Sequence, residues 1–442
     1  MTAKQLDPDS LLSMHLSEKA VPPSTVPAPP SKTEKVAWSF FDFANTAFNT
    51  LIVDLVFGTY FLRIVCAHRT DATWLFGWAL FFCQTIVGVL SPLLGALADV
   101  TGKKKRILSV TYVICIVATA SLAAMGEGDV WASLVAFMAA SIGYSFTENL
   151  TASFLPELAP PAEIGRLSGL ARALGNVGGF FSVAACYPLL TPGFTLANSG
   201  AIRLIFLLTA AIYCAGGLPT LLFVRERGGT MQQDWKSALA TSAVHLSRTF
   251  PKLCREARLR LFFGAFLLYT TGAAMVMAMA ALYGQMQIGL SGQEPVLLLL
   301  SIQTGGCLGA ILFGFIEDFL GSKRTLQLIV WIWFFGMAGF YFVQDKLAFY
   351  AISAILGMGG GSLHAVSRAV VGILSPKNEH AEYFGLWGLF GRLAAGLGPL
   401  AFGLLSQRLH SFHTPMLAAF VCFALSLGLL SSLPHLRPET GA

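Results

Sequence analysis

Six ionisable side chains lie inside or beside long apolar stretches of this 442-residue sequence. On insertion scales an ionisable group within a membrane span costs about 2.5–3.5 kcal/mol, so it normally faces a cavity or a partner. Such groups can bind a polar solute, carry a proton or pair with one another. The six are Asp42, Asp54, Glu148, Arg172, Arg368 and Arg392.

Glu148 and Arg368 are separated by 220 positions, and each lies eight residues before a proline, Pro156 or Pro376. At 1.5 Å per helical residue both therefore lie about 12 Å from the end of a span. We predict either an ion pair across a central cavity, broken or bridged by substrate, or two separate anchors, one in each half of the protein.

Arg172 and Arg392 are also 220 positions apart. A guanidinium at cavity depth can hold a carboxylate or a phosphate with two parallel hydrogen bonds. The two arginines therefore favour an anionic or zwitterionic solute, and a structural role in closing a gate is the alternative.

Asp42, Asn45 and Asn49 form a polar stripe at i, i+3 and i+7 of the first apolar stretch. The stripe either lines the cavity or bonds to a neighbouring span. Asp54 lies about 120° from this stripe on an α-helix, and it either carries a coupling proton or meets water.

We interpret His364 as a neutral hydrogen-bonded residue; the alternative is a proton-linked switch, because the unperturbed pKa of histidine is about 6.5.

Long apolar stretches position these residues. The chain is 55% hydrophobic and 12% charged, whereas soluble chains carry roughly 25% charged residues. A stretch of about 20 apolar residues is long enough to cross a bilayer. We predict spans near 40–65, 74–97, 107–126, 131–153, 168–190, 203–224, 260–283, 296–316, 326–344, 348–373, 384–406 and 415–433.

Polar segments divide the chain into parts. Lys and Arg concentrate in the tails, in the linker and on one set of loops, so we place both termini in the cytoplasm and the protein in the cell (inner) membrane. The predicted parts are a disordered tail at 1–35, a six-helix bundle at 36–224, a linker at 225–259, a second bundle at 260–434 and a tail at 435–442.

Two short loops repeat one pattern of glycine, carboxylate, glycine and cations, shifted by 219 positions. The glycines let spans approach closely, and the carboxylate can cap a neighbouring helix N-terminus. Together with the other matched positions, the loops indicate a duplicated six-helix unit. The loop residues are Gly95, Asp99, Gly102, Lys103 and Lys104 in the first copy, and Gly314, Asp318 and Gly321 in the second.

These loops resemble the signature loop of the major facilitator superfamily, where it latches one alternating-access state. Val100 stands where a cation is usual, so the first latch is either weaker or relies on Lys103 and Lys104. The resemblance implies an all-α integral membrane fold with twelve transmembrane helices in two pseudo-symmetric bundles.

A finer resemblance, over residues 36–434, is to the "unknown major facilitator" family, which includes the autophagy-related vacuolar effluxers. It rests on segments 38–48, 154–169, 360–368 and 382–399. The fungal members are associated with amino-acid efflux, which implies an amino-acid-like solute. The chain departs from the family at His364, where Gln is usual, and at Arg172, where Trp is usual. Thr and Ala also replace a Tyr-Asn pair just before Phe154.

We therefore predict a proton-coupled secondary active transporter, monomeric in the lipid bilayer, that moves a small polar solute by alternating access. The sequence contains no P-loop, no clustered metal ligands and no nucleophile motif. We expect no enzyme activity, catalytic residue, metal, cofactor or nucleic-acid partner. The alternative is a non-transporting receptor or assembly scaffold, which would tolerate Glu148→Ala and Arg392→Ala.

Overall fold

The computed structural model describes residues 29–227, 242, 249, 251–286, 288–290, 294–409 and 413–434. Residues 31–442 form one compact unit, and all that follows concerns that unit. The predicted C-terminal tail, nearly all of the predicted N-terminal tail and most of the predicted linker lie outside the described residues.

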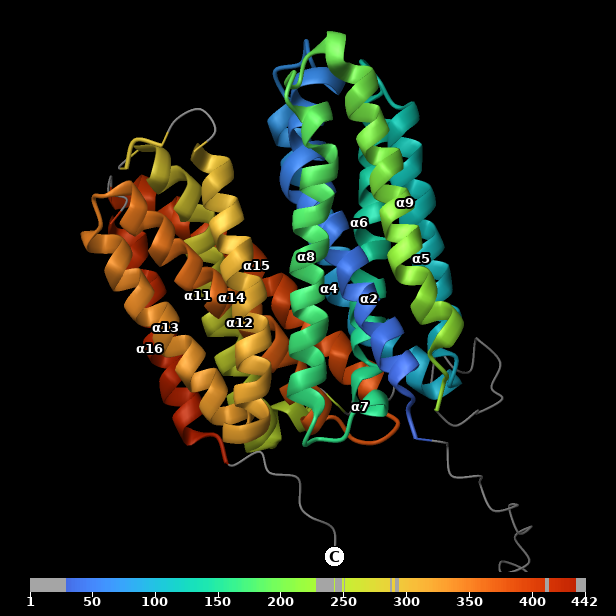
Figure 1. Ribbon diagram of the computed structural model, residues 1–442, viewed down its shortest axis with the longest axis vertical. Coiled ribbons are helices and arrows are strands. Elements are labelled where there is room, and N and C mark those ends of the chain that lie inside the picture. Colours follow the sequence, from blue (N-terminus) through green and yellow to red (C-terminus); the bar gives the residue numbers. More distant parts are fainter. Residues whose placement is uncertain are drawn as a thin grey trace, which may run out of the picture. The chain divides into compact units, whose positions relative to one another are not determined.

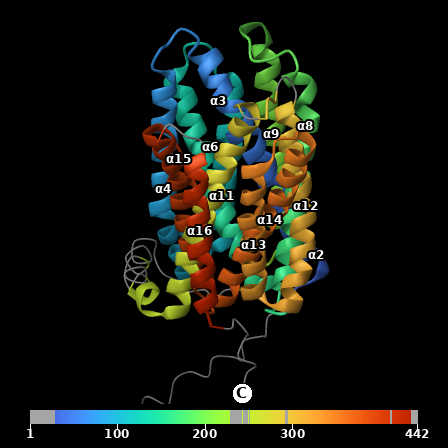
Figure 2. The same ribbon diagram turned by 90° about the vertical axis from the view of Figure 1, so that its left-hand side faces the viewer.

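Helices make up both halves, and the described residues contain no strand (Figure 1). The N-terminal half contains α2 (Lys32–Phe48), η1 (Asn49–Val56), α3 (Phe57–Tyr60), η2 (Phe61–Val65), α4 (Ala72–Thr101), α5 (Lys104–Ser121), η3 (Leu122–Ala124), α6 (Val130–Ala152), α7 (Leu155–Leu158), α8 (Ile164–Leu190), η4 (Leu196–Asn198) and α9 (Ser199–Phe223). The C-terminal half, which faces the viewer in Figure 2, contains α11 (Ala257–Met286), α12 (Glu294–Leu320), α13 (Ser322–Phe342), α14 (Lys346–Leu374), α15 (His380–Leu409) and α16 (His413–Ser432).

Ten described helical segments are long and apolar enough to cross a membrane, and Met416–Ser432 is a shorter apolar helix. With α15 this arrangement is compatible with the predicted twelve spans. The first span begins earlier than predicted, because a capping box between the N-cap Ser31 and Glu34 of the first turn starts the helix at Lys32. The Glu34 N–H donates to Ser31 Oγ at 3.2 Å, and the Ser31 N–H donates to Glu34 Oε2 at 2.8 Å.

Large apolar side chains lie on the outside of both halves. Trp131 of the N-terminal half is 66% exposed, and Phe319 and Phe342 of the C-terminal half are 89% and 77% exposed. Water would solvate such a surface poorly, whereas lipid covers it without loss. The protein is a multi-pass membrane protein.

The two halves meet through α4 against α15 and α8 against α12, and glycines allow the backbones to approach. A Cβ added at Gly95 of α4 would lie 2.0 Å from the Ala381 carbonyl oxygen. A Cβ added at Gly169 of α8 would lie 2.4 Å from the Ala310 carbonyl oxygen. Larger residues at these points would push the halves apart.

The first span changes its winding at η1, which is a π-helix. Its wider turns bring Asn49 and Asp54 together, and Asn49 Nδ2 donates to Asp54 Oδ2 at 2.8 Å. The prediction that Asp54 lies away from the polar stripe is wrong for this reason, since it assumed α-helical winding throughout. Such π-helical turns are rare in proteins, and those that occur often lie at functional sites.

Candidate functional site

The first glycine loop joins the two halves through Asp99 at the end of α4. Asp99 Oδ2 accepts a hydrogen bond at 2.8 Å from the backbone N–H of Glu382, in the first turn of α15. Lys104 Nζ lies 3.1 Å from Asp99 Oδ1 and 2.8 Å from Glu157 Oε1. Of the two lysines expected to compensate for Val100, Lys104 is the one that pairs with the loop carboxylate.

The second loop makes the related contact in the opposite direction. Asp318 Oδ1 accepts a hydrogen bond at 3.2 Å from the backbone N–H of Arg166, in the first turn of α8. In both copies a glycine with positive φ turns the chain after the carboxylate, at 62° for Gly102 and 82° for Gly321. Each half thus caps a helix N-terminus of the other half, the geometry predicted from the sequence.

Arg368 of α14 lies in a buried cluster with Trp38, Asp42 and Ser168, which we call the gate cluster. Its Nη1 donates to Asp42 Oδ1 and Oδ2 at 2.9 and 2.8 Å, and its Nε donates to Ser168 Oγ at 3.0 Å. Its Nη2 donates to the Ser168 carbonyl at 2.9 Å, and the guanidinium lies 5.0 Å from the centre of the Trp38 ring. Arg368 is only 3% exposed.

The predicted ion pair between Glu148 and Arg368 is therefore wrong. The repeat correctly places the two residues at related positions, but it says nothing about the direction in which each side chain extends. Arg368 extends to the first and fifth spans of the other half, where Asp42 supplies the buried carboxylate that a buried guanidinium requires.

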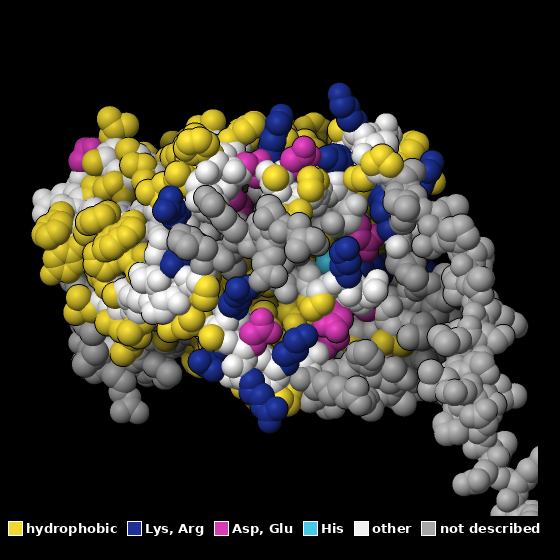
Figure 3. Space-filling model, turned by 90° about the horizontal axis from the view of Figure 1, so that it is seen from below, with side chains coloured by type: hydrophobic (Ala, Val, Ile, Leu, Met, Phe, Trp, Pro, Cys, Tyr) yellow, Lys and Arg dark blue, Asp and Glu magenta, His cyan; other side chains and the backbone are white. Residues whose placement is uncertain are grey.

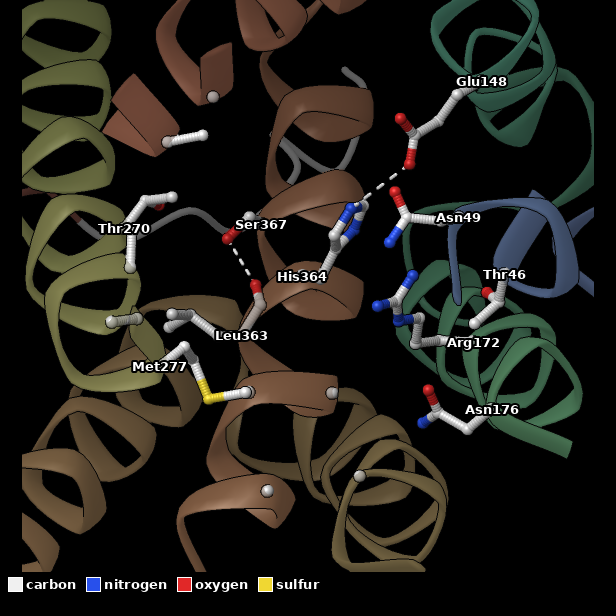
Figure 4. A pocket seen from close by; sticks show the side chains of 18 of the residues that line it. Thr46, Asn49, Glu148, Arg172, Asn176, Thr270, Met277, Leu363, His364 and Ser367 are labelled. Atoms are coloured by element: carbon white, nitrogen blue, oxygen red, sulfur yellow. Dashed lines mark hydrogen bonds and ion pairs between the residues drawn. The ribbon is translucent and has the colours of Figure 1, made fainter. Parts of the chain in front are cut away.

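A cavity of about 490 Å³ lies between the halves and is lined by side chains from both (Figure 4). Glu148 of α6 stands on its wall. Glu148 Oε2 lies 3.3 Å from Arg392 Nη2, and Glu148 Oε1 lies 3.6 Å from His364 Nε2. The predicted carboxylate of the N-terminal half thus faces two groups of the C-terminal half across the cavity.

Arg172 of α8 lines the same cavity and differs from Arg392. Its Nε is buried and has no hydrogen-bond partner within the described residues. Asn176, one turn further along α8, is 4% exposed, and its Nδ2 likewise lacks a partner there. Figure 4 shows both side chains projecting from α8 beside Thr46.

The remaining predicted residues lie in three different environments. Asn49 lines the cavity. Asn45 instead accepts a hydrogen bond at 3.1 Å from the Tyr213 hydroxyl, and Asp42 belongs to the gate cluster. Asp54 is exposed and bound by Asn49, outside the cavity lining. Within the described part of the chain, no cluster of His, Cys, Asp and Glu could hold a metal ion.

Sequence reasoning missed Ser168 and Asn176. Together with Arg172 they stand at four-residue intervals on α8, so a polar stripe at helical spacing was present in the sequence. Trp38 was also missed, and nothing in its apolar surroundings indicates that it stacks on a guanidinium.

Two related helical bundles, joined by matched capping contacts around a central cavity, define a transporter of the major facilitator type. Its structural neighbours agree: the human organic anion transporter MFSD10 has a TM-score of 0.71 at 15% identity, covering 91% of this chain and 100% of that one. A bacterial homologue of the iron transporter ferroportin, in an outward-facing state, has a TM-score of 0.66 at 14% identity, covering 91% of this chain and 98% of that one.

The sequence comparisons assign the chain to one particular family among transporters of this fold. The family described as "Vacuole effluxer Atg22 like" matches residues 60–439, and the chain belongs to it. The MFS-type transporter YxiO of Bacillus subtilis is 24% identical over 90% of this chain and 94% of its own length. Autophagy-related protein 22 of Saccharomyces cerevisiae is 24% identical over 47% of this chain and 42% of its own length.

Proposed function

We propose that this protein is a proton-coupled secondary transporter that moves a small anionic or zwitterionic solute by alternating access. One observation carries the proposal: a cavity lined by both halves lies directly beside a gate cluster that joins them. A site between two bundles that rock against each other is the general arrangement of such transporters.

The gate cluster and the cavity share helices. His364 precedes Arg368 by one turn of α14, and Ser168 precedes Arg172 by one turn of α8. A solute held at Arg172 or His364 therefore lies one helical turn from the contacts that must separate when this end opens. This proximity gives the solute a direct means of favouring one state over the other.

Proton coupling requires a group whose charge can change during the cycle. We assign this role to Glu148 and His364, which face each other at 3.6 Å across the two halves. Movement of the halves would separate them, and separation changes the free energy of protonation of each. Asp54, bound by Asn49 beside the cavity, is the second candidate.

Orientation follows from charge. Lys and Arg side chains gather on the face at the lower end of Figure 1, as Figure 3 shows. Basic loops are retained on the cytoplasmic side of membranes. We therefore place the gate cluster on the cytoplasmic side and the protein in the cell membrane, with both termini inside.

The test is transport by the purified full chain in proteoliposomes. Vesicles are given a metabolite mixture and an imposed proton gradient, and their contents are compared with empty vesicles by mass spectrometry. We expect proton-dependent enrichment of at least one small anion or zwitterion, and we expect Asp42→Ala, which leaves Arg368 without its carboxylate, to abolish it. Lys346→Ala is the control, because Lys346 pairs with Glu294 away from the cavity.

Wild-type protein that inserts correctly but enriches no solute would contradict transport. Enrichment that persists without a proton gradient would contradict proton coupling but would leave the transport function intact. A non-transporting scaffold would show neither enrichment nor any effect of Asp42→Ala.

A further inference from the structure

The cavity lining carries an uncompensated positive charge. Its described side chains include two guanidiniums, Arg172 and Arg392, and one carboxylate, Glu148. Glu148 lies 3.3 Å from Arg392, so that pair is neutral as a unit. Arg172 is left without a carboxylate inside the lining, and an unpaired charge in a region of low dielectric is unfavourable until a counter-charge arrives.

The residues that line the cavity also have more unpartnered hydrogen-bond donors than unpartnered acceptors among their buried atoms. Among the described residues that line the cavity, every buried side-chain polar atom without a hydrogen-bond partner is a nitrogen. These atoms are Arg172 Nε, Asn176 Nδ2, Trp333 Nε1, His364 Nδ1 and Trp387 Nε1. All except His364 Nδ1 are donors in every accessible protonation state.

The remainder of the lining includes the polar side chains Thr46, Asn49, Asn149, Thr270, Gln303 and Ser367, together with an apolar surface from the C-terminal half. Phe266, Ala273, Ala274, Met277, Ile302 and Leu356 form this surface. They offer a solute neither a hydrogen-bond acceptor nor a charge. A ligand that fits both surfaces has an acceptor-only head and an apolar body.

We propose that the cavity binds monoanionic organic acids with an apolar body, and that Arg172 and Asn176 hold the carboxylate. The proposal rests on the transport function proposed above and names its substrate class. A carboxylate only accepts hydrogen bonds, which is what the unpartnered donors require. Its single negative charge also balances Arg172.

A zwitterion fits this site less well. Its ammonium group would need a carboxylate, but Glu148, the one carboxylate in the described lining, already faces Arg392 and His364. Three added N–H donors would also face a lining whose unpartnered groups are already donors. The geometry therefore favours the acid over the corresponding amino acid.

Three probes of nearly the same shape test this assignment: 4-methylpentanoate, 4-methylpentanamide and leucine. Binding to the purified full chain in detergent at pH 7 is measured by titration calorimetry and by thermal stabilisation. We expect the acid to bind at least about tenfold more tightly than the amide or leucine, because a charge-assisted bond to a guanidinium distinguishes it. A series of unbranched acids and benzoate establishes whether another apolar body fits better.

Two variants test the residues. Arg172→Gln should weaken acid binding at least about tenfold. Asn176→Asp, which is nearly isosteric, should weaken it similarly by placing a negative charge against the carboxylate. Arg69→Gln is the matched control: it removes the same charge outside the cavity, where Arg69 pairs with Asp71, and should leave binding unchanged.

Leucine or the amide binding as tightly as the best acid would overturn the proposal. So would acid binding that is insensitive to both variants, or the failure of every acid to bind. Transport has a separate readout: Arg172-dependent acid binding without uptake would preserve this site and remove the proposed function, whereas Arg172-independent uptake of another solute would do the reverse.

Discussion

Both copies of the glycine loop cap a helix N-terminus of the other half, but neighbouring charged residues support the two caps to different degrees. Asp99 lies in the interior, with its side chain 5% exposed, and Lys104 bridges it to Glu157. Asp318 is exposed, and its cap is longer, at 3.2 Å against 2.8 Å. A duplicated motif therefore preserves the capping geometry while its electrostatic support differs between the halves.

The buried carboxylate of the second loop is a different residue, Glu317, which is 3% exposed. A hydroxyl serves it instead of a cation: Ser322 Oγ donates to Glu317 Oε1 at 2.6 Å. The first loop thus buries an ionic network of Asp99, Lys104 and Glu157. The second loop buries Glu317 with a neutral hydrogen-bond donor and leaves its motif aspartate, Asp318, at the surface. We expect the first loop to dominate both stability and switching.

The largest effect should follow Lys104→Met. This change leaves two buried carboxylates, Asp99 and Glu157, without their common cation, and uncompensated buried charge typically costs about 3–5 kcal/mol. We expect the free energy of unfolding in detergent to fall by about that amount. Lys103→Met, at the less buried neighbouring position, should change it by less than about 0.5 kcal/mol. Equal losses in the two variants would refute a special role for Lys104.

A smaller effect should follow Asp99→Ala. The cap on α15 is lost while Lys104 keeps Glu157, so the state joined by this contact should weaken by about 1–2 kcal/mol. We expect the initial transport rate to fall more than the protein level does. Asp99→Asn retains an acceptor for the Glu382 N–H and should lie between Asp99→Ala and wild type. Unchanged initial rates in Asp99→Ala at equal expression would count against a latch.

The smallest effect should follow Asp318→Ala. An exposed carboxylate at 3.2 Å is screened by water, so we expect a loss below about 1 kcal/mol and a correspondingly small change in initial rate. Comparison with Asp99→Ala at matched expression gives the ratio directly. If Asp318→Ala were the more damaging of the two, the difference in burial would not explain the division of roles.

The overall architecture was accessible from the sequence because lipid imposes strong constraints on length and hydropathy. The span ranges, the repeat and the capping role of Asp99 and Asp318 all follow from local patterns. The partner of Arg368 could not be predicted. Counting residues gives the depth of a side chain along its span, whereas the direction in which the side chain extends depends on the rotation of the helix. Arg172 and Arg392 illustrate the same limit, since the repeat relates them but only the tertiary structure shows that one faces Glu148.

The π-helical segment η1 distinguishes the first span of the N-terminal half from that of the C-terminal half. A π-helical turn forms i→i+5 hydrogen bonds and so contains more residues than an α-helical turn. The corresponding first helix of the second half, α11, is α-helical throughout its described length. The first spans of the two halves therefore differ in helical winding. A helical wheel transferred from one half to the other would misplace every residue after Asn49, Asp54 included.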